Sequence, residues 1–318
     1  MRSSTDLGSA STEEAEALAW LLRTLDAQAY DFVTPTLSTV RRWISRPPPE
    51  QPSLRDVFGW GFPFPLQAIE PDLLTALKAA GALEPVGPLV RSRLRGARVH
   101  GRLFLHSAYP GAGESAVFVG PDSYRFADFI RQEIAKAPVR SLFDVGVGAG
   151  VGAVLAHRWS GAERVFASDL NPASLRLAKA NAAHAGVPLQ VGQADGLAAA
   201  PTGLDLIVAN PPYVGGVSGR TYRDGGGALG EGLALAWAKA ALSRLAPGGR
   251  LLLYTGAPIV TGGADPIRTA LAEVSAEAGA AFDYRELDPD IFSGELRRAA
   301  YAEVERIAAV GAVLTRPA

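Results

Sequence analysis

Hydrophobic periodicity divides this chain of 318 residues into two parts with different patterns. In the first part, apolar residues recur at the three- and four-residue spacing of helices. One predicted helix begins near a capping-box pair, Ser11 and Glu14. Its apolar face consists of Leu18, Leu21, Leu22 and Leu25. Thr34-Pro35 and Pro71 are predicted to begin two further helices, because proline suits the first helical turn.

The period then changes to two between Val90 and His106. This alternation predicts a two-stranded ribbon, and Gly96 is the expected turn. A row of arginines runs along it: Arg91, Arg93 and Arg95. We interpret the row as a solvated strand face, with a patch for a phosphate or an acidic substrate as the alternative. Helices followed by a ribbon are typical of a winged helix, so residues 1–108 are predicted to form a small, mainly helical domain.

From residue 109 onward, short apolar strands alternate with helices, which predicts a parallel α/β sheet in a second domain over residues 109–318. Helices are expected to begin at Pro121 and at Asn171-Pro172. The predicted strands cover residues 141–145, 164–168, 189–191, 204–209 and 250–255. Two apolar stretches near the end of the chain, 281–287 and 304–315, are predicted to form a closing antiparallel pair.

The amino-acid composition limits which kinds of site and partner the chain can have. The chain has no cysteine and four histidines, none at H-E-x-x-H spacing, so disulfides and thiolate metal sites are excluded and a zinc enzyme is not expected. The formal net charge of −1 argues against a protein that coats nucleic acid. No apolar run reaches the ~18–20 residues of a membrane span, and the polar N-terminal stretch lacks a signal-peptide core. We therefore expect a cytoplasmic protein without a membrane or metal partner.

The first candidate site follows the strand at residues 141–145. It is Asp144-Val-Gly146-Val-Gly148-Ala-Gly150, with glycine at every second position. Such glycines allow a tight turn that brings the backbone close to a ligand. Gly148, Gly150 and Ala153 also satisfy a G-x-G-x-x-A dinucleotide fingerprint, so NAD competes as the ligand.

Two acidic residues follow the next two strands. Asp169, with Leu170 beside it, lies about 20 residues past the glycine loop, where a carboxylate can accept hydrogen bonds from ribose hydroxyls. As a simple helix cap it would compete with Asn171. Asp195-Gly196 follows the third strand, and a carboxylate there can accept from an adenine amino group.

The most specific motif is Asn210-Pro211-Pro212-Tyr213, directly after the fourth strand. Two prolines prevent continuation as a strand or an immediate helix, so a rigid loop is predicted. The side-chain carbonyl of Asn210 and a backbone carbonyl can together bind one –NH2 group and aim its lone pair. Tyr213 offers a flat stacking face. The pattern favours chemistry on a planar nitrogen.

Residues from about 120 to 318 resemble the class I S-adenosylmethionine (SAM) methyltransferases of the "small methyltransferase" group. The resemblance is carried by the glycine loop and by the N-P-P-Y quartet of amino-group methyltransferases, which include release-factor glutamine and N6-adenine enzymes. It implies a Rossmann-like sheet of seven mostly parallel strands with the last strand antiparallel.

By position, the resemblance gives cofactor contacts to Asp144, Gly146, Gly148, Gly150, Asp169, Leu170, Asp195, Gly196 and Asn210. Asn210 and the Pro211 carbonyl would orient the acceptor nitrogen, with Tyr213 beside it. Asp224, in a D-G-G stretch, and Asp144 are the candidates to take a proton, and Tyr124 could touch the cofactor or the acceptor. The tail also resembles a group of two-domain bacterial proteins assigned as methyltransferases.

The leading hypothesis is methyl transfer from SAM to a nitrogen of a protein glutamine, an amino acid or a natural-product intermediate. A second hypothesis is cyclisation of SAM itself to azetidine-2-carboxylate with release of methylthioadenosine. The same motifs also leave room for methylation of a ribosomal RNA base, for an NAD-dependent oxidoreductase, and for an inactive module that binds nucleic acid. Residues 1–108 would select the substrate.

Overall fold

The computed structural model describes residues 12–108, 115–213 and 229–318. The chain divides into two compact units, neither of which is continuous in sequence. Unit 1 combines the residues up to Ser123 with Gly148–Gly150 and Asn171–Gly186. Unit 2 contains Tyr124–Val147, Val151–Leu170 and Val187–Ala318. Ser11 and Asp224 lie outside the described residues.

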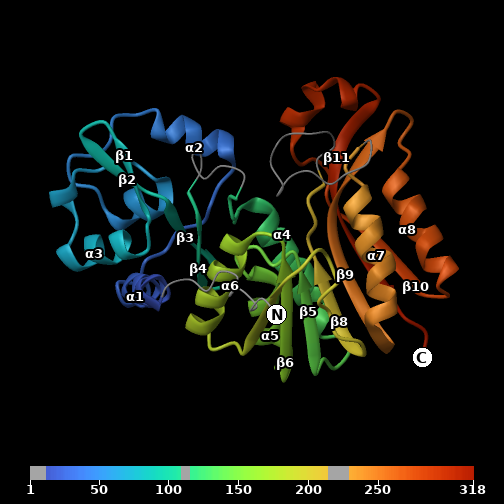
Figure 1. The fold of residues 1–318 in the computed structure, drawn as a ribbon. Coiled ribbons are helices and arrows are strands. Elements are labelled where there is room, and N and C mark those ends of the chain that lie inside the picture. Colours follow the sequence, from blue (N-terminus) through green and yellow to red (C-terminus); the bar gives the residue numbers. More distant parts are fainter. Residues whose placement is uncertain (1–11, 109–114, 214–228) are drawn as a thin grey trace, which may run out of the picture. The chain divides into compact units, whose positions relative to one another are not determined.

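Unit 1 is built from helices and two hairpins (Figure 1). Its helices are α1 (Thr12–Ala27), α2 (Leu37–Ile44), α3 (Pro71–Ala79) and α6 (Pro172–His184), with shorter turns at Arg55–Trp60 and Leu66–Ala68. Its strands are β1 (Leu83–Val86), β2 (Leu89–Ser92), β3 (Leu94–Val99) and β4 (Arg102–Ser107), paired β1 with β2 and β3 with β4.

The helices of unit 1 follow the predicted pattern with one shift. All four leucines of the predicted face of α1 are buried, and α3 begins at Pro71. The helix predicted to begin at Thr34-Pro35 begins at Leu37 instead. Thr36 is its N-cap, because its side chain accepts a hydrogen bond from the Thr39 N–H.

The ribbon turns at His100-Gly101, so the predicted turn at Gly96 is wrong. Both residues of this turn have positive φ, 46° and 76°, as a two-residue hairpin turn requires. Gly96 lies within β3 opposite Leu105, and its carbonyl accepts a hydrogen bond from the Tyr30 hydroxyl at 2.8 Å. A glycine inside a strand here accommodates the Tyr30 ring, since an added Cβ would lie 3.0 Å from its Cε1.

The prediction that the arginine row forms a solvated strand face is also only partly correct. Arg93 is exposed, but Arg95 is buried, with 3% of its surface accessible. Burial disfavours the charged form and lowers the pKa of Arg95 to about 10. Tertiary packing thus places one arginine of the row inside unit 1 rather than in solvent.

Unit 2 contains a seven-stranded sheet with the order β10-β11-β9-β8-β5-β6-β7. Its strands are β5 (Ser141–Val145), β6 (Arg164–Asp169), β7 (Leu189–Gln193), β8 (Leu204–Ala209), β9 (Leu245–Val260), β10 (Ala281–Asp288) and β11 (Val304–Thr315). β11 runs antiparallel to both of its neighbours, β9 and β10, as predicted for the closing pair, and the strands from β9 to β7 pair in parallel. The predicted fold class is therefore confirmed.

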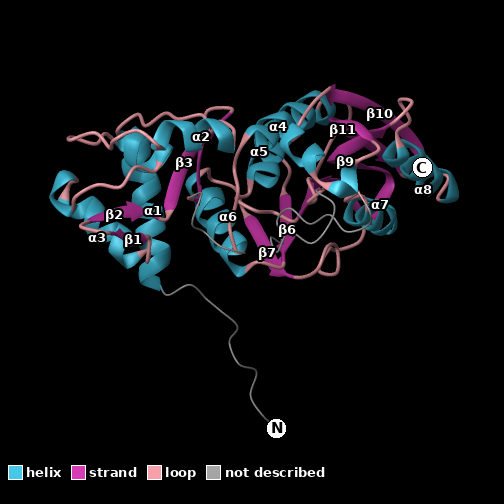
Figure 2. Ribbon diagram, turned by 90° about the horizontal axis from the view of Figure 1, so that it is seen from above, coloured by secondary structure: helices cyan, strands magenta, loops and turns pink. Residues whose placement is uncertain are grey.

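Helices cover both faces of this sheet (Figure 2). On one face, α7 (Gly232–Arg244) and α8 (Pro266–Glu277) bury alternate residues of β9 and β11 in a shared apolar core. On the other face, α4 (Pro121–Ile134) places Phe126 beside Tyr254 and Phe129 against Gly311. The helix α5 (Val151–Ser160) follows β5, and short 3-10 turns at Ser293–Arg297 and Ala299–Tyr301 separate β10 from β11.

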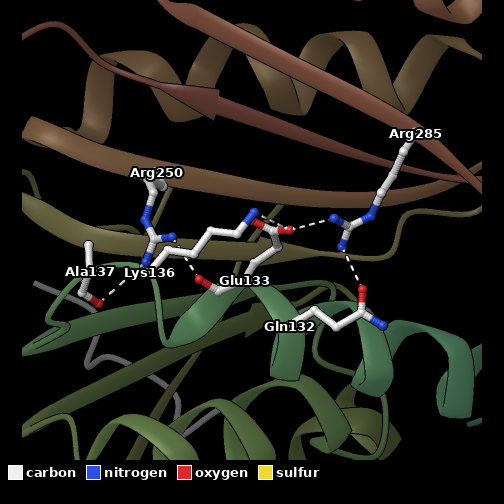
Figure 3. Close-up of polar contacts among 6 residues, drawn as sticks. All are labelled: Gln132, Glu133, Lys136, Ala137, Arg250 and Arg285. Atoms are coloured by element: carbon white, nitrogen blue, oxygen red, sulfur yellow. Dashed lines mark hydrogen bonds and ion pairs between the residues drawn. The ribbon is translucent and has the colours of Figure 1, made fainter.

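Polar contacts fix the C-terminal end of α4 to the sheet (Figure 3). The Glu133 carboxylate, with 1% of its side chain exposed, pairs with Lys136 at 2.7 Å and with Arg285 of β10 at 2.9 Å. Arg250 of β9 donates to the backbone carbonyl of Glu133 at 2.8 Å and so supplies a partner to the helix end. At the first turn of α4, Arg125 pairs with Asp288 at 2.8 Å. These contacts hold α4 at both ends.

Candidate functional site

The loop between β5 and α5 adopts a backbone that glycine alone adopts readily. Gly146, Gly148 and Gly150 have φ of 66°, 51° and 86°. Gly146 is further restricted by packing, because a Cβ there would lie 2.8 Å from Cη2 of Trp237 on α7. The alternating glycines of the sequence are thus explained by backbone conformation, with close packing at Gly146.

Asp144, the last polar residue of β5, braces the start of α5. Its carboxylate is buried, and one oxygen, Oδ2, accepts a hydrogen bond from the Ala153 N–H at 2.7 Å. Burial, with a further contribution from the charge of Asp169, raises the pKa of Asp144 to about 8, although the bond from Ala153 opposes this shift. Asp144 therefore caps a helix, and its predicted contact with a cofactor stays a prediction.

Asp169 and Leu170 end β6. The Asp169 side chain is half-buried, and its backbone carbonyl accepts from the Ala194 N–H at 3.3 Å. Leu170 is 62% exposed. The cap of α6 is Asn171, whose side chain accepts from the Ala173 N–H at 3.0 Å. The carboxylate of Asp169 is therefore not needed to begin that helix.

Asp195 and Gly196 follow β7. Asp195 is exposed, and the Gly196 carbonyl accepts from the Ser168 hydroxyl at 2.6 Å, which ties this loop to β6. A Cβ at Gly196 would lie 2.9 Å from Nε1 of Trp237. The Trp237 indole, 9% exposed, thus supports the loops at Gly146 and Gly196 together.

Trp237 is a site residue that could not be predicted from the sequence. Its place on α7 gave no signal, because the contact joins segments that are distant in the chain.

The Asn210-Pro211-Pro212-Tyr213 segment leaves the end of β8. Asn210 is half-buried and Pro211 is buried. The Tyr213 ring, 9% exposed, lies against Gly256 of β9, where a Cβ would come within 2.4 Å of its Cδ2. Phe292 meets the same ring edge-on, with centroids 5.7 Å apart. The ring is therefore fixed in place, and Phe292 is a second neighbour that the sequence did not predict.

Four predicted site segments follow four neighbouring parallel strands. The registers pair Val145 with Ser168 and with Ala209, and Asp169 with Gln193. The carboxyl ends of β5, β6, β7 and β8 consequently share one edge of the sheet, where ligands bind in open α/β sheets. Tyr124 lies in the first turn of α4 and is half-buried.

These residues fit a nucleoside cosubstrate. The glycines of the loop let a ligand approach the backbone, and the carboxylates at the end of β6 and after β7 can accept hydrogen bonds from hydroxyl and amino groups. The described residues contain no group of three or more His, Asp or Glu side chains suited to hold a metal ion. None of the described helices has both the length and the apolar character to cross a membrane.

The strand order and the glycine loop after β5 are those expected of a Rossmann-like class I methyltransferase fold. Residues 125–260 match the family model described as "Methyltransferase small domain". This match agrees with the predicted resemblance to the small methyltransferases.

Two relatives are named methyltransferases. A release factor glutamine methyltransferase from Cereibacter sphaeroides is 32% identical over 197 residues, which cover 57% of this chain and 65% of that protein. Ribosomal RNA small subunit methyltransferase C from Pseudomonas syringae pv. syringae is 33% identical over 132 residues, or 41% of this chain and 33% of that protein. The chain thus spans less than two thirds of the length of these curated relatives.

Among solved structures, Trm5b from Pyrococcus abyssi aligns with a TM-score of 0.49 and 17% identity, over 73% of this chain and 62% of that one.

Proposed function

We propose that this protein transfers the methyl group of SAM to a nitrogen of an amide or amino group. The observation that carries the proposal is the Asn-Pro-Pro-Tyr segment at the end of β8, which lies inside the methyltransferase family segment. Its oxygens suit a nitrogen that must keep its lone pair free for attack. An oxidoreductase using NAD would leave this segment without a role.

The cofactor would be held at the shared edge of the sheet. The backbone of Gly146, Gly148 and Gly150 would face the methionine part, Asp169 the ribose and Asp195 the adenine amine. When bound, SAM supplies a methyl group activated by a positively charged sulfur. Positioning of the reacting atoms can contribute up to about 7–11 kcal/mol to the lowering of the barrier.

The acceptor nitrogen would be aligned by two carbonyl oxygens. The side-chain oxygen of Asn210 and the backbone oxygen of Pro211 would accept its hydrogens, which aims the lone pair and favours the positive charge that develops on nitrogen. Tyr213, held by Gly256 and Phe292, would cover the planar group. The nitrogen must then lose one proton. Asp224 is the proposed acceptor of that proton, because Oδ2 of Asp144 is already engaged with Ala153.

We propose a glutamine-type amide as the acceptor. The net charge of −1 gives the whole molecule no basic field for RNA, and three relatives are named release factor glutamine methyltransferases. Other relatives are named ribosomal RNA methyltransferases, so a base nitrogen is the rival. Residues 1–108 would select between acceptors.

Two variants separate the roles of acceptor and cofactor residues. Asn210→Ala should lower the turnover rate by about 100-fold or more, with the dissociation constant for SAM unchanged within about threefold. Asp195→Asn should show the reverse, with weaker SAM binding and a near-normal rate at saturating SAM. Calorimetry measures SAM binding, and release of S-adenosylhomocysteine measures turnover on glutamine-bearing proteins, amino acids and RNA. Equal losses in both measurements for Asn210→Ala would make it a cofactor residue and contradict the proposal.

Incubation with SAM alone tests the cyclisation of SAM. Mass spectrometry should find SAM unchanged. Formation of methylthioadenosine with azetidine-2-carboxylate would replace the methyl-transfer proposal.

A further inference from the structure

Asn181 on α6 joins three segments of unit 1 through its buried side-chain amide. The side chain has no exposed surface. Its Oδ1 accepts from the Leu105 N–H at 2.9 Å, and its Nδ2 donates to the Leu105 carbonyl at 2.9 Å. The same Nδ2 donates to the Ala149 carbonyl in the glycine loop, also at 2.9 Å. Both amide hydrogens are therefore used, one on the ribbon and one on the loop.

On the ribbon side, the amide of Asn181 replaces a neighbouring strand. Leu105 pairs with Gly96 on one edge of β4, and its own N–H and carbonyl both meet Asn181. A buried strand edge needs such partners, because an unpaired peptide group away from water is costly. The position of β4 is therefore linked to the position of Asn181.

On the loop side, Asn181 fixes one peptide plane. Ala149 stands between Gly148 and Gly150, two glycines that would let the peptide between them rotate with little steric cost. A peptide is planar and trans, so a carbonyl held toward α6 directs the N–H of Gly150 to the opposite side. Gly150 also packs on α6 without a side chain between them, since a Cβ would lie 3.4 Å from Cα of Ala178.

We propose that Asn181 is a positioning residue for SAM binding. It holds the Ala149–Gly150 peptide with its N–H turned away from α6, available to an oxygen of the cofactor, and it couples this orientation to the ribbon of unit 1. The inference rests on the proposed use of SAM.

The test compares Asn181→Ala with Leu177→Ala, another buried residue on the same helix. Asn181→Ala should weaken SAM binding about tenfold, which corresponds to about 1.4 kcal/mol. The rate at saturating SAM should stay within twofold of wild type. Leu177→Ala removes apolar contact only, so it should lower the melting temperature at least as much while SAM affinity stays within twofold. Wild-type affinity in folded Asn181→Ala, or equal weakening in Leu177→Ala, would overturn the proposal.

Asn181→Asp provides a second test if the alanine variant does not fold. The carboxylate still accepts from the Leu105 N–H but faces the Ala149 carbonyl without a hydrogen to donate. SAM affinity of this variant should be lower than wild type at pH 8 and should recover toward it at pH 5.5, where a protonated carboxyl group donates again. A variant-to-wild-type ratio that is independent of pH would overturn the proposal.

Measuring SAM binding and methylated product separately distinguishes failure of the proposed function from failure of the proposed role of Asn181. SAM binding without any methylated product in the acceptor screen would refute the proposed function and leave the role of Asn181 standing. Absence of SAM binding by the wild-type protein would overturn both.

Discussion

Replacement of Asp144 by asparagine should change how stability depends on pH. Asparagine keeps the size of the side chain and an oxygen that accepts from the Ala153 N–H, but it has no proton to lose. In the wild-type protein, burial raises the pKa of Asp144 from 3.8 to about 8. Between these values the native state holds a proton that the unfolded state has released, so unfolding releases it. The stabilising effect of low pH is therefore lost as the pH rises.

The size of this pH effect follows from a difference of one bound proton between the native and the unfolded state. A full proton difference changes the free energy of unfolding by about 1.4 kcal/mol per pH unit. Between pH 5 and pH 7 the contribution of Asp144 to the free energy of unfolding should fall by about 2–3 kcal/mol. Both pH values lie between the pKa of Asp144 in the unfolded state and its pKa in the native state. The side chain is 2% exposed, so solvent screens this effect little.

Urea unfolding followed by circular dichroism at pH 5, 6 and 7 measures the effect. The stability of Asp144→Asn relative to wild type should increase by about 2 kcal/mol or more across this range. Asp205→Asn is the control. Hydrogen bonds from Arg140 and Ser141 overcome partial burial and lower the pKa of Asp205, so its titration window lies below 3.8. Parallel curves for Asp144→Asn and wild type would show that Asp144 is ionised in the native state and refute the reasoning.

Two further predictions concern the sheet. Glu133→Ala should lower the free energy of unfolding by about 3–5 kcal/mol, because Arg285 loses its buried carboxylate partner. Glu133→Gln should lower the free energy of unfolding by less. Equal losses for the two variants in urea unfolding would contradict the role given to the ion pair. Gly256→Ala should displace the Tyr213 ring and lower turnover at least tenfold with SAM affinity unchanged; wild-type turnover of the folded variant would show that the ring position is unimportant.

The sheet of unit 2 could be predicted because its signals are local. Parallel strands are buried on both faces and form short apolar runs, and each of the first four is followed by a polar or glycine-rich loop. The glycine pattern from Gly146 to Gly150 reports a positive-φ backbone conformation, which glycine adopts more readily than other residues. The candidate residues at the carboxyl ends of these strands could be placed for the same reason.

The features that could not be predicted from the sequence depend on contacts between segments that are distant in the chain. Gly96 is a residue type typical of turns, but it lies within a strand, where the Tyr30 ring packs against it. The turn itself is at His100, which adopts a positive φ. Arg95 is buried although its neighbours in the row are not, because tertiary packing rather than alternation decides its surroundings. Trp237 and Phe292 became apparent only from their neighbours in three dimensions.

The discontinuity of unit 1 affects the order in which the protein can fold during synthesis. The helix α6 buries Leu177, Ala178 and Asn181, and it belongs to the same unit as α1 and β4. A ribosome releases α1 and the ribbon well before residue 186, so these elements must wait for their last partner while β5 and β6 of the sheet are being made. The nascent N-terminal segment would expose apolar surface during this interval, which makes it a natural target for chaperones. A truncated protein that ends before α6 would keep that surface exposed permanently.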